Sequence, residues 1–378
     1  MDARQTMKKK LMLIVPMLHQ GGFERVCVAT ARLLEAYADV YIVVFDSKDI
    51  AYDIKGLHVT DLHLGVKEGK IGKIWNVVRR SLAVRKLKKE WEIDIAYSFG
   101  PSANMVNVFS KSKGEVWTGI RSYMDMGNAR LIRLFSRCSD RVLCCSKRIE
   151  EEITLQYHCR NAVTLYNPLD VEALERNAAG EEIRLPWEDR ENMIASMGRE
   201  DDVKGFWHLL KSFSLVRKKV PDAKLMIIGD GEFEEYRTLA KELGVGDEVY
   251  FTGMKKNPFP YLHAAKVYVL TSYHEGFPNA LVEAMALGIP VIATDCLTGP
   301  REILRKGDAS YGVLIPNMSP VKNLDPSEIS EEEKNLADEI KRMLTDQGYY
   351  AKYQEASAAR AKDFSNACYV ECIRGWIG

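Results

Sequence analysis

Short apolar runs alternate with longer amphipathic stretches along the first half of the chain. The runs are rich in Val, Ile and Leu, which is typical of strands buried on both faces of a parallel sheet. Helical patterns separate them, so the sequence predicts an α/β domain with helices on both faces of its sheet. Ser146 is the predicted N-cap of one of these helices. The predicted strands cover residues 11–15, 40–45, 94–98, 115–118 and 141–145.

The second half repeats the same alternation. Predicted strands begin at residues 193, 225, 249 and 313, another ends near Thr271, and another covers 290–293. Predicted helices cover about 279–287, ending before a break at Gly288, and about 328–346, 348–362 and 366–377. Asn167-Pro168 interrupts the pattern, and we place a linker at about 166–190. The sequence therefore predicts two doubly wound, Rossmann-like domains.

Composition and charge agree with two globular domains. The chain has 378 residues, 46% hydrophobic and 28% charged, which is too long for one compact core. Net charge is zero, but residues 1–170 carry 27 Lys and Arg against 19 Asp and Glu, whereas the remainder carries 26 against 34. This change of sign supports a boundary near residue 170 and suggests that the first half faces something anionic.

The sequence predicts a cytoplasmic protein. No apolar run approaches the roughly 18 residues of a membrane span, and no secretory signal pattern follows the basic start at 8–10. The eight cysteines and seven histidines lack the spacing of zinc sites. We therefore expect reduced thiols and no metal, and we expect no nucleic acid as a partner.

The helical stretch at 71–90 is unusual because apolar and basic residues are mixed in it. Seven Lys and Arg occur between Lys73 and Lys89. A solvated charged face is the ordinary interpretation, and attraction to anionic lipid, with peripheral binding at the inner face of a membrane, is the alternative. The apolar residues among these cations are Ile74, Val77, Val78, Leu82, Val84 and Leu87.

Two acids stand near the start of the helix predicted at 279–287. Glu275 precedes the helix and Glu283 lies within it, eight residues further on. A helix start offers unpaired N–H groups and a positive dipole end, which suit anions and sugar hydroxyls. Since Pro278 has no N–H, the candidate donors there are Phe277, Asn279 and Ala280. A capped helix with a solvated Glu283 is the competing interpretation.

Glycines and cations follow two other predicted strands. Gly21-Gly22 permits a tight turn after the first strand, with N–H groups available to a diphosphate. Arg199 and Lys204 follow the strand that begins at 193, where two cations are well placed to neutralise a diphosphate. Solvated surface cations are the competing interpretation.

Four motifs in one domain resemble retaining glycosyltransferases of the GT-B fold, in particular glycosyltransferase family 4. They are G-R-x4-K-G, I-G-D-G-E, F-T-G and E-x7-E, in this order from Gly198 to Glu283. The resemblance implies two Rossmann-like domains with a cleft between them: residues 1–168 on the acceptor side, 169–360 binding the nucleotide sugar, and a final helix, 361–378, packing back on the first domain.

The resemblance also implies roles for individual residues. Glu275 would lie beside the donor sugar as the catalytic residue, and Glu283 would bind the ribose. Arg199 and Lys204 match the family's phosphate-binding pair. The loops carrying Gly229 and Met254 would form the nucleotide pocket, and the loop at Gly21 and Gly22 would approach the diphosphate.

One family feature is absent. Many members carry a His near the end of the fourth strand, whereas residues 97–104 read Y-S-F-G-P-S-A-N. Arg121, which follows the next strand, either offers a polar group to the ligand or forms a structural ion pair.

The implied activity is transfer of a sugar, with retention, from a nucleoside-diphosphate sugar to a hydroxyl of a glycan or lipid-linked acceptor. UDP is the favoured nucleotide by family frequency, no cofactor is required, and bacterial surface polysaccharide assembly is the expected setting. The alternatives are a catalytically silent nucleotide-sugar-binding subunit and a GT-B sugar-nucleotide epimerase. A NAD-linked dehydrogenase is disfavoured because the G-x-G-x-x-G fingerprint is missing.

Overall fold

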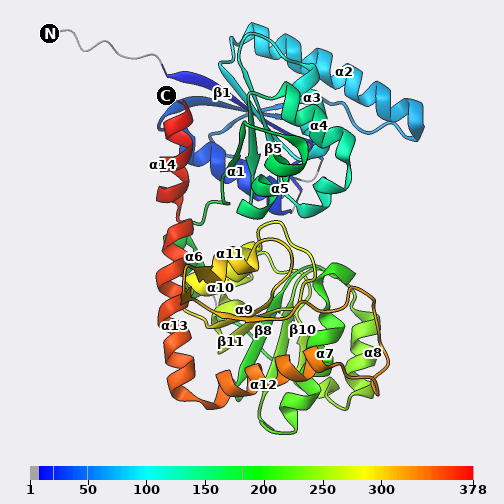
Figure 1. Cartoon of the computed structure of the whole chain (residues 1–378), viewed down its shortest axis with the longest axis vertical. Coiled ribbons are helices and arrows are strands. Elements are labelled where there is room, and N and C mark those ends of the chain that lie inside the picture. The colour runs from blue at the N-terminus through cyan, green and yellow to red at the C-terminus, as the bar shows by residue number, and fades with distance from the viewer. Residues whose placement is uncertain (1–7, 20, 49, 181, 378) are drawn as a thin grey trace, which may run out of the picture. The chain divides into compact units, whose positions relative to one another are not determined.

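The computed structural model describes residues 8–19, 21–48, 50–180 and 182–377. It divides the chain into two compact units, each with a parallel sheet covered by helices (Figure 1). Of the described residues, those up to Pro168 and those from Asn366 onward form the first unit. Residues from Leu169 to Ser365 form the second unit.

Within the described residues, the first unit has a seven-stranded parallel sheet in the order β3-β2-β1-β4-β5-β6-β7. The strand order changes direction between β1 and β4, which is the topological switch point where ligands bind in such sheets. The strands are β1 (Lys9–Val15), β2 (Ala38–Val44), β3 (His58–Asp61), β4 (Ile95–Phe99), β5 (Glu115–Ile120), β6 (Arg141–Cys144) and β7 (Ala162–Thr164). The helices are α1 (Gly22–Leu34), α2 (Gly69–Glu90), α3 (Pro101–Phe109), α4 (Ala129–Cys138), α5 (Lys147–Tyr157) and α14 (Asn366–Ile377).

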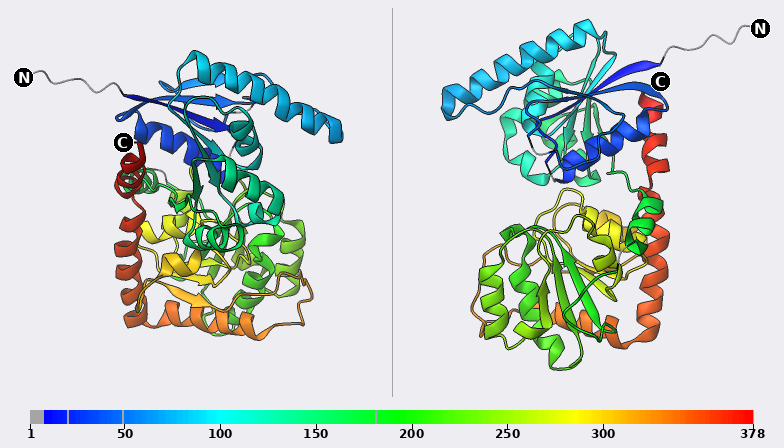
Figure 2. Two further views of the ribbon diagram at one scale, coloured as in Figure 1. Left: turned by 45° about the horizontal axis from the view of Figure 1, so that its top comes forward. Right: turned by 180° about the vertical axis from the view of Figure 1, so that it is seen from behind.

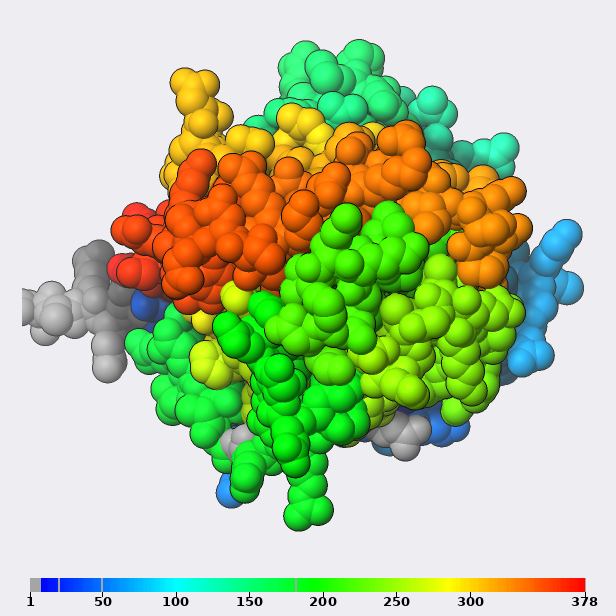
Figure 3. Space-filling model, turned by 90° about the horizontal axis from the view of Figure 1, so that it is seen from below, coloured from blue at the N-terminus to red at the C-terminus, as the bar shows by residue number. Residues whose placement is uncertain are grey.

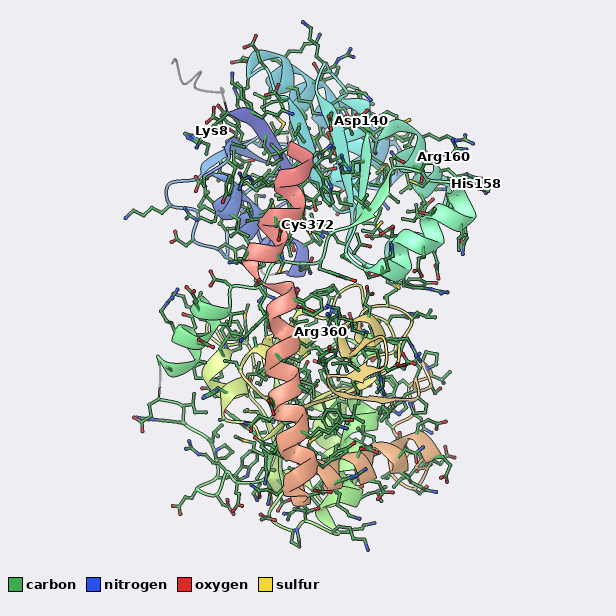
Figure 4. All side chains as sticks on the ribbon, turned by 60° about the vertical axis from the view of Figure 1, so that its left-hand side comes forward. Lys8, Asp140, His158, Arg160, Arg360 and Cys372 are labelled. Atoms are coloured by element: carbon green, nitrogen blue, oxygen red, sulfur yellow. The ribbon has the colours of Figure 1, made fainter. Side chains whose placement is uncertain are left out.

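Alternate residues of these strands build two cores, one on each face of the sheet. Leu11 and Leu13 of β1 pack with α1 and α14, whereas Met12 and Ile14 pack with α2 and α3. Helix α14, on which Figure 4 labels Cys372, is fixed to the first unit by a 2.7 Å hydrogen bond between the hydroxyls of Tyr369 and Thr30. The end of the chain thereby completes the first core.

The second unit repeats the arrangement. Within the described residues its main sheet has six parallel strands in the order β10-β9-β8-β11-β12-β15, with the switch point between β8 and β11. A hairpin of β13 (Arg305–Lys306) and β14 (Ala309–Ser310) stands apart from this sheet. The strands are β8 (Met193–Met197), β9 (Lys224–Ile228), β10 (Val249–Phe251), β11 (Val267–Leu270), β12 (Val291–Thr294) and β15 (Val313–Ile315). The helices are α6 (Val171–Ala179), α7 (Phe206–Arg217), α8 (Glu234–Glu242), α9 (Phe259–His263), α10 (Asn279–Ala286), α11 (Pro300–Leu304), α12 (Glu331–Thr345) and α13 (Gln347–Ala361).

Polar contacts tie the last two helices of the second unit to its earlier helices. His208 of α7 bonds Glu333 of α12 through Nδ1 at 2.7 Å, and Figure 3 shows the orange segment of α12 beside green surface. Arg360 of α13, labelled in Figure 4, donates to the carbonyl oxygens of Ile303 and Glu302 in α11 at 2.9 and 2.8 Å. Helices α12 and α13 are therefore packed parts of the second unit.

The predicted fold class, two Rossmann-like α/β domains, is confirmed. The linker predicted at 166–190 is wrong for part of its length, because α6 occupies 171–179. Asp170 caps this helix by accepting from the Ala173 N–H at 2.9 Å, and Leu174 is buried at 3% exposure. Among the described residues, no helix is both long enough and apolar enough to cross a membrane.

Candidate active site

The candidate site lies in the second unit, where β8 and β11 end on either side of the switch point. The turn after β8 is docked on the segment after β11 by two hydrogen bonds. Thr271 Oγ1 donates to the Lys204 carbonyl oxygen at 2.8 Å, and the Tyr273 N–H donates to the Val203 carbonyl oxygen at 3.1 Å. The carboxyl ends of two central strands thus present their loops as one surface.

Lys204 and Glu275 are in direct contact across the switch point. Lys204 Nζ lies 2.8 Å from Glu275 Oε1, and the two side chains are only 23% and 11% exposed. The residues are 71 positions apart, so the fold rather than local sequence brings them together. The Glu275 backbone is held as well, because the Thr298 hydroxyl donates to its carbonyl oxygen. Lys204 and Glu275, which were both predicted to belong to the site, therefore lie next to each other.

Arg199 lies on the same turn but is held differently. Its guanidinium donates to Asp201 Oδ2 at 2.8 and 3.2 Å, and its side chain is 75% exposed. Partial burial would raise the pKa of Asp201, but hydrogen bonds from the Arg199 side chain and the Val203 N–H outweigh it and lower that pKa. Sequence reasoning missed Asp201, although it stands between the two predicted phosphate ligands.

Glu283 lies in the middle of α10 and is only 4% exposed, so the competing interpretation of a solvated Glu283 is wrong. Glu275 and Glu283 both act electrostatically on the hydroxyl of Tyr268, a buried residue of β11. Burial raises the pKa of Tyr268, and these two acids raise it further. Tyr268 is therefore electrostatically coupled to both acids. Sequence reasoning missed it because a tyrosine in an apolar strand gives no signal beyond core packing.

Gly229 is placed where the loop after β9 meets the loop after β8. A Cβ at Gly229 would overlap the carbonyl oxygen of Gly198, so only glycine fits there. The two loops are joined by the Gly198 N–H to Ile228 carbonyl bond at 2.9 Å and the Glu200 N–H to Asp230 carbonyl bond at 2.7 Å. The predicted residue Gly229 thus supports the turn that carries Arg199.

The predicted N–H donors stand at the start of α10, as expected. Asn279 and Ala280 are the first two helical residues, and the Pro278 carbonyl oxygen accepts from the Leu281 N–H at 3.0 Å. The Phe277 side chain is buried against Phe364, with 5.4 Å between ring centres. The structure therefore brings this helix start close to Glu275, while binding by these N–H groups stays a prediction.

Met254 is not brought to the same place. It follows β10, the edge strand of the sheet, which β9 separates from β8, and its side chain is 55% exposed. The exposed side chain leaves this loop accessible to a ligand, but the strand before it, β10, is two strands away from β8, which leads to Lys204.

Gly21 and Gly22 lie in the first unit, at the start of α1. The hydroxyl of Tyr52 accepts from the Gly21 N–H at 2.8 Å and donates to the Gly21 carbonyl at 2.7 Å. The expectation that the Gly21 N–H is available to a diphosphate is therefore wrong, and Gly22 stays the candidate donor. A Cβ at Gly21 would overlap the Glu24 carboxylate, whose pKa burial raises.

One of the two expectations for Arg121, a structural ion pair, is wrong. Among the described residues it forms no ion pair, and its guanidinium carbon lies instead 5.3 Å from the Phe99 ring centre and 5.9 Å from that of Tyr97. Cation–π contacts therefore replace the ion pair as its structural partners.

The chain is similar to known glycosyltransferases. Residues 181–360 match the family model for glycosyl transferases group 1. A Methanocaldococcus jannaschii protein named as an uncharacterized glycosyltransferase is 40% identical over 187 residues, which span 46% of this chain and 46% of that protein. A Campylobacter jejuni enzyme is 27% identical over 373 residues, or 94% of this chain and 96% of the enzyme. It is named N-acetylgalactosamine-N,N'-diacetylbacillosaminyl-diphospho-undecaprenol 4-alpha-N-acetylgalactosaminyltransferase.

Solved structures show the same fold. HepE from Anabaena, in complex with UDP-glucose, aligns with a TM-score of 0.75 at 17% identity over 97% of this chain and 99% of that chain. TarM aligns with a TM-score of 0.78 at 14% identity, covering 98% of this chain and 99% of that chain. Together with the family match to the second unit, these findings support a glycosyltransferase with the GT-B fold.

Proposed function

We propose that the chain is a retaining glycosyltransferase of family 4 that moves a hexose-type sugar from a UDP-sugar to a hydroxyl of a glycan or lipid-linked saccharide. One observation carries this proposal: Lys204 and Glu275 meet at the switch point of the domain that matches the family model. This is where parallel α/β sheets bind their ligands.

The residues suit a departing nucleoside diphosphate. Cleavage of the bond to the sugar builds negative charge on the diphosphate, and Lys204 and Arg199 would stabilise that charge in the transition state more than in the ground state. Both cations already have carboxylate partners, Glu275 and Asp201. When a phosphate takes over Lys204, the Glu275 carboxylate becomes available to accept from sugar hydroxyls. Glu283 would bind the ribose, and the loops of Gly229 and Met254 would border the nucleotide.

Relatives support the donor and acceptor classes. HepE was crystallised with UDP and with UDP-glucose, which supports a UDP-sugar donor. The Campylobacter enzyme is named for a saccharide on diphospho-undecaprenol, and a Bacillus subtilis relative is a poly(glycerol-phosphate) alpha-glucosyltransferase. Both names specify alpha products, which an alpha-configured donor gives with retention. These relatives support a lipid-linked or polymeric acceptor. The setting would be bacterial surface polysaccharide assembly at the inner face of the membrane.

Ligand binding followed by transfer tests the proposal. A thermal-shift panel of UDP-, GDP- and ADP-sugars should show the largest rise with a UDP-sugar, and the best binder should then be turned over with saccharide acceptors. Proton NMR of the product reports whether the anomeric configuration is retained. Binding without either transfer or donor hydrolysis would instead indicate a silent nucleotide-sugar-binding subunit.

A further inference from the structure

Helix α2 of the first unit buries mostly polar side chains and leaves a stripe of apolar side chains exposed. Most surface helices bury apolar residues and expose polar ones. Here four of the five buried side chains are polar: Asn76, Arg80, Ser81 and Lys88, with Val84 the fifth. The exposed apolar residues are Ile71 (85% exposed), Ile74 (67%), Trp75 (52%), Val78 (41%) and Leu82 (63%).

Hydrogen bonds fix this orientation. Asn76 exchanges two bonds with the Lys67 backbone, at 3.1 and 2.9 Å, and the Arg80 guanidinium donates to the Leu64 carbonyl at 2.7 and 3.0 Å. Lys88 Nζ donates to the side-chain and backbone oxygens of Asn107 at 2.6 and 3.0 Å. Turning α2 to bury its apolar face would break all of these bonds. The apolar residues are therefore held outward by the fold.

The outward residues form one stripe along the helix. Spacings of three, four and seven residues from Ile71 to Leu82 put these side chains on a single face. The same face continues through the exposed cations Arg85, Lys86 and Lys89, so the stripe is apolar in its first half and cationic in its second. In both views of Figure 2, α2 lies along the outside of the first unit.

We propose that this stripe, the lipid-docking face (Ile71, Ile74, Trp75, Val78, Leu82, Arg85, Lys86 and Lys89), binds the surface of an anionic phospholipid bilayer. The apolar half enters the interfacial region, where an indole ring such as that of Trp75 is favoured, and the cationic half lies on the headgroups. The inference rests on the proposed function only in that a lipid-linked acceptor has to be met at such a surface.

The positive charge of the lipid-docking face favours an anionic bilayer over a second copy of the chain. Residues 69–89 contain no acid, and the excess of cations in residues 1–170 has the same sign. In a symmetric dimer through this face, each copy would place its cations against a matching surface that has no compensating acids. An anionic bilayer offers both the apolar interior and the opposite charge.

Vesicle flotation with the whole chain tests the proposal, using phosphatidylcholine with and without phosphatidylglycerol. The wild type should float with anionic vesicles and lose affinity as salt rises. Ile74→Ser with Val78→Ser should weaken binding at every salt concentration. Arg85→Gln, Lys86→Gln and Lys89→Gln together should weaken binding to anionic vesicles on the order of a hundredfold, since each cation contributes about 1 kcal/mol.

Matched controls separate docking from general stickiness. Leu155→Ser removes a 76% exposed apolar side chain from α5 of the same unit, and Lys218→Gln with Lys219→Gln removes exposed cations of the second unit. Both controls should bind vesicles as the wild type does. Circular dichroism should show every variant folded, because all of the changed side chains are exposed or only partly buried.

Three outcomes overturn the inference: a wild type that ignores both kinds of vesicle, a control that loses as much affinity as the docking variants, or a stripe that mediates dimerisation in sedimentation velocity without lipid binding. Transfer to a water-soluble acceptor keeps the two proposals apart. A chain that transfers but ignores vesicles sinks this inference alone, whereas one that docks but turns over no nucleotide sugar sinks the proposed function alone.

Discussion

The Lys204–Glu275 contact determines what each residue can do. Both side chains are largely shielded from water, so the pair interacts more strongly than an exposed ion pair, which contributes about 0–1 kcal/mol. A carboxylate alone beside a diphosphate would repel it, but Lys204 neutralises that charge. In the proposed function the pair provides an acid for the sugar and a cation for the phosphate, and its own two charges cancel.

We expect Glu275→Ala to abolish sugar transfer while leaving UDP affinity nearly intact. The lost group acts on the sugar rather than on the nucleotide, and loss of a polar group that stabilises the transition state costs roughly 10²–10³ in rate. Initial rates of transfer and calorimetric titration with UDP measure the two effects. Glu242→Ala, an exposed acid on α8, is the control. Wild-type turnover by the Glu275 variant would remove this residue from the mechanism.

Lys204→Ala should weaken binding of UDP far more than binding of uridine. The variant loses a charge-assisted hydrogen bond to phosphate, about 1.5–3 kcal/mol, and leaves Glu275 uncompensated near the diphosphate. Titration with both ligands at one ionic strength gives the comparison, and Lys218→Ala, an exposed lysine of the same unit, should change neither affinity. Equal losses for UDP and uridine would contradict a phosphate role.

At the scale of elements, the site depends on the loops after β8 and β9 lying in backbone contact. Gly229→Ala forces these loops apart, and overpacking of this kind costs about 1–3 kcal/mol. We expect a lower melting temperature together with weaker UDP binding, because the displaced turn carries Arg199 and Lys204.

Gly348→Ala is the matched control for that prediction. Gly348 lies in the first turn of α13, where an added Cβ meets only Asp346 Oδ1 at 3.5 Å, and alanine in a helix is favoured over glycine by about 0.5–1 kcal/mol. It should melt at or slightly above the wild-type temperature. If Gly229→Ala behaves the same way, the close approach of the two loops is not needed.

Local sequence signals were sufficient for most elements. Ser146 accepts from the Ile149 N–H at 3.3 Å as the predicted N-cap, and Gly288, at φ +71°, ends the segment of α10 as predicted. Helix α6 was missed because its stretch is polar and short, and its identity depends on packing against α9 and α10. The polar buried face of α2 was equally beyond local reasoning, since its polar residues contact the 64–67 loop, Phe45 and α3, which are distant in sequence or follow β2.

The candidate site was predictable as a set of residues but not as an arrangement. Motif spacing singled out Lys204 and Glu275, but no local signal shows that they pair directly across 71 positions. The Arg199–Asp201 pair could have been predicted, because an acid two residues from a cation in a turn is a local feature of the sequence. Tyr52 accepts the hydrogen bond of the Gly21 N–H from a loop 31 residues away, and nothing in the local sequence indicated this contact.

At the scale of the whole molecule, the chain consists of two units with separate hydrophobic cores. Residues of α14 complete the core of the first unit, whereas Lys204 and Glu275 belong to the second. A change in one core and a ligand bound by the other unit should therefore act on different unfolding events.

Scanning calorimetry can test this separation. Ile373→Ala removes a side chain of 0% exposure from α14 and should destabilise the first unit by about 2–5 kcal/mol. UDP at 100 times its Kd should stabilise the second unit by about 2.7 kcal/mol. We expect two transitions, one lowered by Ile373→Ala and the other raised by UDP, with the exposed control Glu371→Ala changing neither. If UDP raised the transition that Ile373→Ala lowers, the nucleotide could not be bound by the second unit alone, and the assignment of Lys204 to phosphate would lose its structural basis.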